Sequence, residues 1–187
     1  LDVDLLRQMS SELGDEIAGL EAEIYRLAGE RFNIQSPQQL GTILFDKLKL
    51  PAGKKTKKTK SYSTGADTLE ELATAGHELP QYLLRFRELA KLKSTYVDAL
   101  PQLVAADGRV HTRFQQAVAA TGRLSSVNPN LQNIPVRTGL GMKIRRAFCA
   151  APGALLVAAD YSQIELRVLA HIAGELAMIE AFRSGED

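Results

Sequence analysis

The sequence contains no tryptophan and a single cysteine, Cys149. One thiol cannot form an internal disulfide framework, and such cysteine use is typical of a reducing compartment, where we expect Cys149 to be a small buried hydrophobe. No stretch reaches the roughly 18 consecutive apolar residues that a membrane-spanning helix needs, and no basic-then-apolar leader opens the chain. The sequence therefore predicts a cytoplasmic protein without a membrane partner.

Neither end of the sequence has the features of a natural terminus. Leu1 is not a methionine, and the chain stops at Glu186-Asp187 without a tail. A chain of 187 residues, 45% hydrophobic and 24% charged, can bury a core and has an ordinary globular composition. We expect a piece of a longer protein that forms one large domain or two small ones.

Acidic residues are missing from two long stretches. Residues 1–50 contain nine acids and five bases, whereas residues 54–60 contain five lysines and no acid. Residues 108–159 contain seven bases and again no acid, which the formal net charge of +1 conceals. Basic stretches of this kind predict a polyanionic partner, with nucleic acid as the first candidate.

The first hundred residues have the periodicity of helices. Apolar residues recur every three or four positions from Asp4 to Ala28, and Gly29 is placed to end that helix. Ser36-Pro37 predicts the capped start of a second helix, which ends before Pro51. The segment 53–65 has no such periodicity, so we expect an exposed loop there. Further helices are predicted over 67–75, with Asp67 as its cap, and over 80–96.

The pattern changes after the turn dipeptide Asp107-Gly108. Alternating residues predict a strand, and an Asn- and Pro-rich stretch predicts a structured loop. An apolar run then predicts a buried strand that ends at Asp160 and is followed at once by a turn and a helix. The predicted elements are a strand over 110–118, a turn at 121–122, a returning segment over 123–126, the loop 128–135, a strand over 154–159 and helices over 141–148, 163–173 and 175–182.

Two features have more than one interpretation from the residues alone. A carboxylate at the end of a strand, such as Asp160, is placed where metal ions and substrates commonly bind, but it could equally cap the following helix. The lysine-rich segment could be a solvated charge run or a contact with phosphates, since Lys, Ser and Thr are the side chains that bind them.

Three stretches in this order closely resemble the motifs of family A DNA polymerases, the bacterial DNA polymerase I group. They are Thr121-Gly122-Arg123-Leu124-Ser125-Ser126, the loop from Asn128 to Pro135, and Asp160-Tyr161-Ser162-Gln163-Ile164-Glu165-Leu166-Arg167, which is similar to motif A. The resemblance extends over essentially the whole chain. It implies an α+β fold, with a mostly helical thumb subdomain over 1–105 and a partial palm over 106–187 that has a small antiparallel sheet and flanking helices. The thumb tip would be the loop 53–65, and motif A would be the strand, turn and helix of 154–173.

The resemblance implies template-dependent addition of dNTPs to a primer 3′ end by a DNA-directed DNA polymerase that uses two Mg²⁺ ions. Asp160 would be the catalytic, metal-binding carboxylate, and the backbone carbonyl of Tyr161 a further ligand. Glu165 could be read as a second metal ligand, but the resemblance places it beside the incoming sugar, where it excludes a ribose. Gln163 and Ile164 would share in this selection of the dNTP.

The remaining residues implied by the resemblance contact DNA. Arg123, Asn130, Gln132 and Asn133 would test the minor groove at the primer end, where purine N3 and pyrimidine O2 accept hydrogen bonds in every correct pair. The phosphate-contacting candidates are Ser125, Ser126, Lys54, Lys55, Lys57, Lys58, Lys60, Lys91 and Lys93.

The sequence shows neither a fingers helix with its Lys and Tyr nor the second acidic motif of such enzymes. We therefore expect the isolated chain to be inactive, although its parent is a polymerase. Two other functions stay open, a non-catalytic duplex-DNA-binding module derived from the same fold and a relative of the single-subunit RNA polymerases. We expect a monomer that binds primer-template duplex DNA and dNTP in the bacterial cytoplasm, near the nucleoid.

Overall fold

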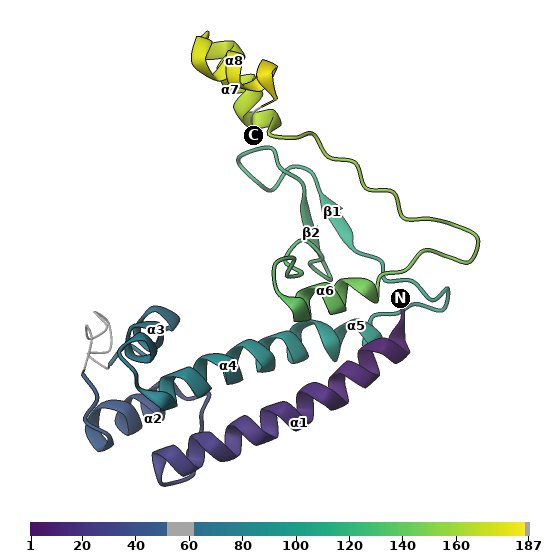
Figure 1. The fold of residues 1–187 in the computed structure, drawn as a ribbon. Coiled ribbons are helices and arrows are strands. Elements are labelled where there is room, and N and C mark those ends of the chain that lie inside the picture. Colours follow the sequence, from purple (N-terminus) through teal and green to yellow (C-terminus); the bar gives the residue numbers. More distant parts are fainter. Residues whose placement is uncertain (52–61, 186–187) are drawn as a thin grey trace. The chain divides into compact units, whose positions relative to one another are not determined.

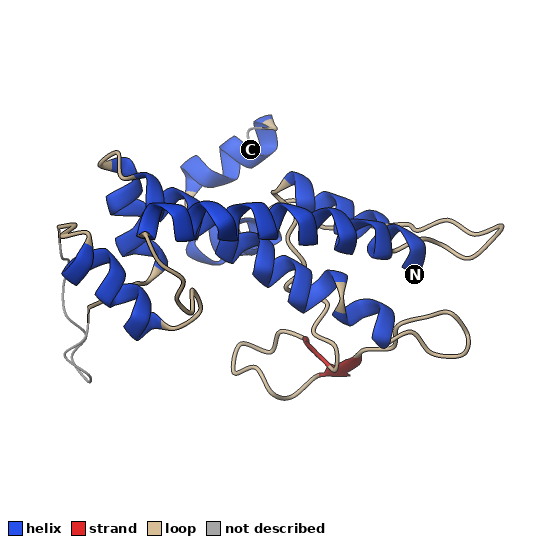
Figure 2. Ribbon diagram, turned by 90° about the horizontal axis from the view of Figure 1, so that it is seen from below, coloured by secondary structure: helices blue, strands red, loops and turns tan. Residues whose placement is uncertain are grey.

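The computed structural model describes residues 1–51 and 62–185, and its elements are mostly helical (Figures 1 and 2). The chain divides into two compact units, the first from Leu1 to Cys149 and the second from Ala150 onward. Among the described residues, no helix is long and apolar enough to cross a membrane. The boundary between the two compact units lies at 149/150, and residues 106–149 belong to the first unit. The predicted boundary between a thumb and a palm at 105/106 is a different division and stays a prediction.

Two long helices, α1 (Val3–Ala28) and α4 (Glu78–Leu92), run side by side through the first unit (Figure 1). The Asp2 side chain caps α1 by accepting a hydrogen bond from the Leu5 amide at 2.9 Å, and Gly29 ends it with a φ of 73°. This left-handed conformation favours glycine, as the sequence predicted. The apolar stripe of α1 faces α4, so amphipathic spacing alone fixes which sides of the two helices pack together.

Among the shorter helices of the first unit, α3 lies close to its predicted position, the helix predicted to end before Pro51 is divided into α2 and η1, and α5 was not predicted. Ser36 caps α2, and Pro37 occupies its first turn. Asp67 is not a cap, because Gly65 takes the N-cap position of α3 and Asp67 lies in the first turn, where a carboxylate favours the helix dipole. The remaining elements are α2 (Pro37–Gly41), α3 (Ala66–Thr74), α5 (Ala99–Gln102) and the π-helical turns η1 (Thr42–Lys47) and η2 (Lys93–Val97).

Both π-helical turns close with a hydrogen bond across five residues. Leu48 donates to the Ile43 carbonyl and Asp98 donates to the Lys93 carbonyl, each at 2.9 Å. Such turns insert one residue into a helix and are frequent at functional sites. The sequence predicted uninterrupted helices in both places, since a single inserted residue leaves no mark in the apolar spacing.

The core of the first unit consists of two apolar clusters joined by α1. One cluster holds α2, η1 and α3 against the C-terminal half of α1, and the other holds η2, α5 and α6 (Gly139–Arg146) against its N-terminal half. Ile17 and Leu20 pack against both clusters. The two ends of the unit therefore share one continuous framework.

The sheet has two antiparallel strands, β1 (Arg113–Gln115) and β2 (Ser125–Val127), with Phe114 paired to Ser126. The strand predicted over 110–118 is therefore too long. Val110 forms only an isolated bridge with Val104, and Phe114 is 60% exposed. A strand persists only where a neighbour continues the ladder, and β2 supplies three pairing positions.

The loop 128–135 is structured, as predicted, and leads into α6. Ile134 is buried in the second apolar cluster, and the Thr138 side chain caps α6 through the Gly141 amide at 3.0 Å. Gly141 lies against Pro135, because a Cβ built on it would be 2.5 Å from the Pro135 carbonyl oxygen. Cys149, expected to be buried, is exposed at the end of the unit, beyond the reach of the apolar clusters.

The second unit contains α7 (Ile164–Ala173) and α8 (Leu176–Ser184), close to the predicted bounds. The prediction of a buried strand over 154–159 is wrong, because these residues form no regular element and are exposed, with Leu155 and Val157 each 89% accessible. Among the described residues of this unit, no segment pairs with them. An apolar run has strand propensity, but without a ladder and a covering layer it forms no strand.

Candidate functional site

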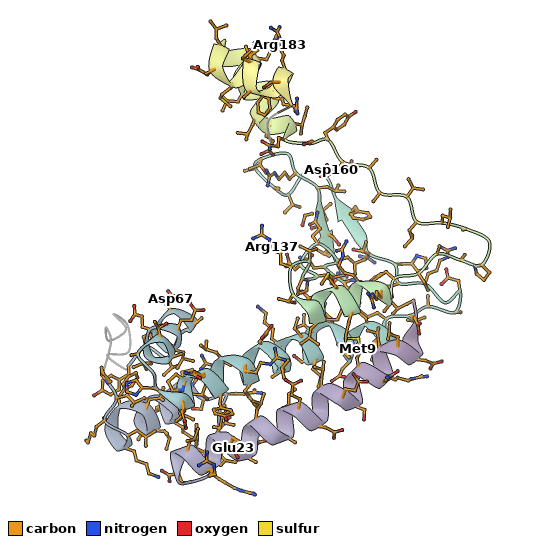
Figure 3. All side chains as sticks on the ribbon, viewed as in Figure 1. Met9, Glu23, Asp67, Arg137, Asp160 and Arg183 are labelled. Carbon is orange, nitrogen blue, oxygen red and sulfur yellow. The ribbon has the colours of Figure 1, made fainter. Side chains whose placement is uncertain are left out.

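Asp160 lies on extended, exposed backbone directly before the turn into α7 (Figure 3). Tyr161 follows with 80% of its surface exposed. A carboxylate and an adjacent backbone carbonyl are hard oxygen ligands, which is the donor chemistry that Mg²⁺ prefers. The described residues contain no group of three or more His, Cys, Asp or Glu side chains that could hold a metal ion. The metal-binding role of Asp160 and of the Tyr161 carbonyl therefore stays a prediction.

Arg167, in α7, contacts both the turn that follows Asp160 and the helix α8. Its Nε donates to the Ser162 carbonyl at 3.0 Å, and its guanidinium lies 4.6 Å from the centre of the Phe182 ring. Gln163 enters α7 with a φ of 50°, in the left-handed region. The hydrogen bond and the cation–π contact link the turn, α7 and α8, so the direction in which the chain leaves Asp160 is set locally.

The predicted sugar-selecting residues lie at the start of α7. Glu165 is exposed in its first turn, Ile164 is 45% exposed and Gln163 is partly buried. A carboxylate in the first turn is favoured by the helix dipole. Glu165 lies five positions after Asp160 in the sequence and within the same compact unit.

Arg123, Asn130 and Asn133 are exposed residues of the first unit. Arg123 follows Gly122, whose φ of 74° makes the turn that the sequence predicted, and precedes β2. The Tyr96 hydroxyl donates a short hydrogen bond to the Asn133 carbonyl and so fixes the loop 128–135 to η2. Asn130 and Asn133 are thus exposed on a loop that is anchored to the helical core, and Arg123 is exposed two positions before β2.

Gln132 and Ser126 have internal partners. The Gln132 amide donates to the Leu124 carbonyl at 2.8 Å and accepts from the Ser126 amide at 3.1 Å. Ser126 is 0% exposed, so the phosphate contact predicted for it does not fit its position, whereas Ser125 is partly exposed. The loop 128–135 folds back onto β2, and the side chains of Gln132 and Ser126, which were predicted to contact DNA, form the hydrogen bonds that hold it there.

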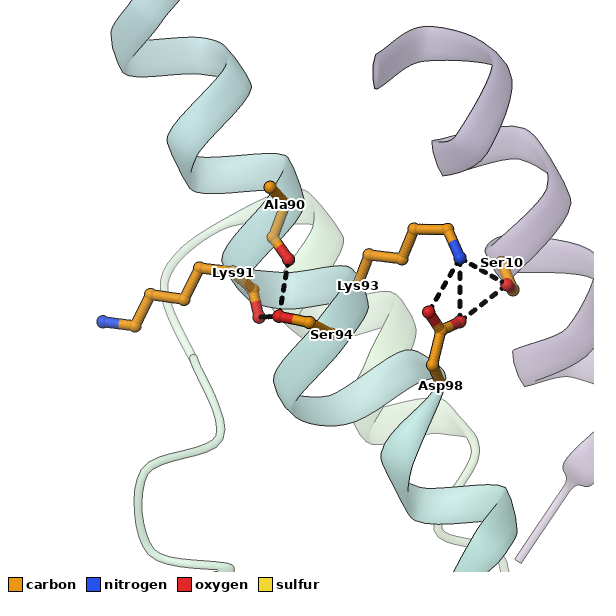
Figure 4. A network of polar contacts seen from close by, with 6 residues as sticks. All are labelled: Ser10, Ala90, Lys91, Lys93, Ser94 and Asp98. Carbon is orange, nitrogen blue, oxygen red and sulfur yellow. Dashed lines mark hydrogen bonds and ion pairs between the residues drawn. The ribbon is translucent and has the colours of Figure 1, made fainter. Parts of the chain in front are cut away.

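Lys93 is also engaged within the protein (Figure 4). Its Nζ lies 2.8 Å from Asp98 Oδ2 and donates to the Ser10 hydroxyl at 2.8 Å. Burial raises the pKa of the Asp98 carboxyl, but the hydrogen bonds from Lys93 and Ser10 and the charge of Lys93 outweigh it, so that this pKa lies below its ordinary value. Through Ser10 this network joins η2 to α1, and the contacts of its Nζ leave Lys93 a weaker candidate for DNA contact than its charge suggested.

Lys91 extends away from this network and is exposed (Figure 4). It keeps the predicted capacity to meet a phosphate. The five lysines predicted to grip the duplex, Lys54, Lys55, Lys57, Lys58 and Lys60, lie outside the described residues. At the exit of that segment, Arg87 donates to the Thr64 carbonyl at 2.6 Å, and burial lowers the pKa of its guanidinium.

Sequence reasoning missed the residues that hold the site in place. The Tyr96 hydroxyl reaches a carbonyl 37 positions away, and Thr112 Oγ1 lies 2.8 Å from the carbonyl of Pro129, 17 positions away. Both partners are backbone groups, which every residue type carries, so no spacing of side chains could have revealed them. Arg137 is exposed in the loop before α6 (Figure 3). The sequence indicated this residue only as one of the seven bases in the acid-free stretch 108–159.

Comparisons with known proteins agree with the motifs. The chain is 58% identical over 188 residues to the thermostable DNA polymerase I of Thermus aquaticus and 56% identical over 189 residues to DNA polymerase I of Geobacillus stearothermophilus. These alignments cover 100% of this chain but 22% and 21% of the relatives, so the chain spans about a fifth of the curated relatives it matches.

The fold agrees as well. The solved POL domain of Pol1 from M. smegmatis, in complex with DNA primer-template and dNTP, matches with a TM-score of 0.88 and 46% identity over 100% of this chain and 33% of that chain. This match confirms the predicted α+β fold. The model of the family described as DNA polymerase family A matches residues 3–187, and together with the bacterial relatives it shows that the chain belongs to DNA polymerase family A.

Proposed function

We propose that this chain is the part of a DNA-directed DNA polymerase that holds the primer-template duplex and supplies the first carboxylate of the catalytic metal site. The observation that carries the proposal is the match in fold, with a TM-score of 0.88 and 46% identity, to a polymerase domain solved with primer-template and dNTP. The reaction would be template-dependent addition of a dNTP to a primer 3′ end. Its partners would be the duplex and the dNTP.

The metal site would be completed by ligands beyond this chain. Asp160 and the Tyr161 carbonyl would hold Mg²⁺, consistent with their exposure and their oxygen chemistry. Bound divalent ions would supply activation of the primer 3′ hydroxyl and charge neutralisation of the triphosphate. Asp160 contributes negative charge at a fixed point of the backbone, while Arg167 holds the turn beside it.

The discrimination steps would use residues whose side chains are exposed. Arg123, Asn130 and Asn133 would donate to minor-groove acceptors of the primer-terminal pair, which tests pair geometry without reading sequence. Glu165 would lie beside the incoming sugar and disfavour a 2′ hydroxyl by a steric and polar clash. Lys91 and the lysines of 54–60 would contact phosphates.

We further propose that the 187 residues alone do not catalyse extension. One carboxylate and one carbonyl do not provide the ligands that two Mg²⁺ ions require. A primer-extension assay on the isolated chain should give no templated product at any Mg²⁺ concentration. Templated synthesis by the isolated chain would show that this part of the proposal is wrong.

The central experiment removes the Asp160 charge in a complete polymerase that carries these residues. Asp160→Asn should lower kcat for dNTP addition by about 10²–10³-fold or more, the scale of one lost electrostatic contact to a transition state. Duplex binding, followed by fluorescence anisotropy, should change little. Glu180→Gln, an exposed carboxylate of α8, is the matched control and should leave kcat unchanged. Equal rates in both variants would contradict the role of Asp160.

A further inference from the structure

Two hydroxyl side chains, one buried and one partly buried, contact the loop 128–135. Ser126 is 0% exposed, and Thr112, directly before β1, is partly buried. Their oxygens are 2.7 Å apart. Among the residues that the structure describes, Ser126 and Thr64 are the only buried polar side chains. Burying a hydroxyl costs free energy unless it is hydrogen-bonded. The hydrogen-bond partners of these two hydroxyls therefore show which part of the chain they hold in place.

The number of protons and the distances together favour one direction for the hydrogen bonds. Each hydroxyl has one hydrogen to donate. The Leu131 amide donates to Ser126 Oγ at 3.1 Å, and the Pro129 carbonyl oxygen lies 2.8 Å from Thr112 Oγ1 but 3.2 Å from Ser126 Oγ. Thr112 Oγ1 also lies 3.1 Å from the Val127 carbonyl oxygen. The shorter distance favours the Pro129 carbonyl as the acceptor of the Thr112 hydrogen, and the Ser126 hydrogen is then available to Thr112 Oγ1. The bonds then form one continuous series, in which each link polarises the next.

The two ends of this series enclose a candidate DNA contact. Pro129 contributes the final acceptor and Leu131 the first donor, and Asn130 lies between them in the chain. Its backbone is thus held on both sides while the residue itself is exposed. The Gln132 amide adds two bonds to β2 and to the Leu124 carbonyl, next to Arg123. The loop that carries Asn130 is therefore tied both to β2 and to the residue that follows Arg123 in the chain.

We propose that Thr112 and Ser126 are positioning residues for recognition of the primer-terminal base pair. The proposal rests on the function proposed above, in which Arg123 and Asn130 test the minor groove. A mismatched pair displaces its minor-groove acceptors, so only donors held in a fixed position distinguish it from a correct pair. The hydroxyl pair would supply that rigidity without touching DNA.

The test compares Thr112→Val with Thr112→Ser in a complete polymerase that carries these residues. Valine keeps the shape of threonine but cannot donate to the Pro129 carbonyl, whereas serine retains the hydroxyl. The measured quantity is the ratio of kcat/KM for extending matched and mismatched primer ends. We expect Thr112→Val to lower this ratio about five-fold, the scale of one neutral hydrogen bond, and Thr112→Ser to restore it. Ser126→Ala, which adds no volume, should give the same loss and serves if the valine variant fails to fold.

Arg123→Ala in the same enzyme separates this inference from the proposed function. If Arg123→Ala lowers the matched-to-mismatched ratio and the hydroxyl variants do not, the positioning role is wrong and the minor-groove role stands. If Arg123→Ala leaves the ratio unchanged, both are wrong. An equal loss in the valine and serine variants would assign the effect to packing and would also overturn the inference.

Discussion

At the scale of single residues, a first prediction concerns the choice of sugar. Glu165 is exposed in the first turn of α7, five positions after Asp160. In a complete polymerase, Glu165→Ala should raise ribonucleotide incorporation relative to dNTP incorporation by about 10- to 100-fold, as expected when a steric block is removed from a pocket. Single-nucleotide kcat/KM values for dATP and ATP would measure the ratio. Glu180→Ala on α8 is the control, and an unchanged ratio for Glu165→Ala would remove it from the selection of sugar.

A second prediction at this scale concerns Asp98, whose pKa is lower in the folded chain than its ordinary value. A carboxyl of this kind stabilises the fold above its unfolded pKa, about 3.9, and that stabilisation is lost as the pH falls through the folded pKa. Asp98→Asn should therefore lower the free energy of unfolding by about 0.5–1 kcal/mol at neutral pH, since the pair with Lys93 is partly exposed.

Urea unfolding at pH 7 and at about pH 2.5 would check this dependence. The difference between wild type and Asp98→Asn should shrink at the lower pH, because the charge of the carboxyl is lost progressively as the pH falls toward its lowered folded pKa. Glu23→Gln is a suitable control because its pair with Arg26 lies within one helix and joins no two elements. A difference of the same size at both pH values would mean that the Asp98 charge contributes nothing.

At the scale of elements, the contact between α6 and Pro135 is sharply testable. A Cβ on Gly141 would lie 2.5 Å from the Pro135 carbonyl oxygen, whereas nothing lies within 4 Å of the Cβ position of Gly139. Gly141→Ala should destabilise the chain by about 1–3 kcal/mol, the usual cost of overpacking. Gly139→Ala, in the same helix, should be close to neutral. Equal melting temperatures for the two variants would contradict the tight packing.

The elements also show what the sequence could and could not predict. Amphipathic spacing located α1 and α4 because their stability comes from an apolar stripe that the residues display directly. The strand over 154–159 was predicted wrongly because a strand depends on partners that its own residues do not specify. The same reason shortens β1, where Phe114 has the right propensity but only three positions of β2 to pair with.

The candidate site follows the same division. Asp160, Arg123 and Asn130 were identified from motifs, and the structure leaves all three exposed. The internal roles of Ser126 and Lys93 were not predictable, since each depends on a partner brought close by tertiary packing. The sequence does not show whether a serine or a lysine faces solvent, where it could meet a phosphate, or contacts another part of its own chain.

At the scale of the whole molecule, the distribution of charge predicts how the isolated chain binds DNA. If the five lysines of 54–60 each neutralise a phosphate, the affinity for duplex should fall with salt at a logarithmic slope of about −0.9 per contact. Replacing these five lysines with glutamine should reduce the magnitude of that slope by about 4.5 and weaken binding equally on duplexes of any sequence. Anisotropy titrations between low and high salt would measure it. Lys47→Gln is the control, because Lys47 pairs with Glu30, and an unchanged slope in the glutamine variant would exclude the lysine segment from binding.

The length of α1 has a consequence for the spacing of the two ends of the first unit. Its 26 residues span about 39 Å, at 1.5 Å of rise per residue. One apolar cluster packs on each half of this single helix, and Ile17 and Leu20 contact both clusters. Ile134, from the loop 128–135, lies in one cluster, and Tyr62, which follows the lysine segment, packs against the other. A single helix therefore sets the distance between the loop and the exit of that segment.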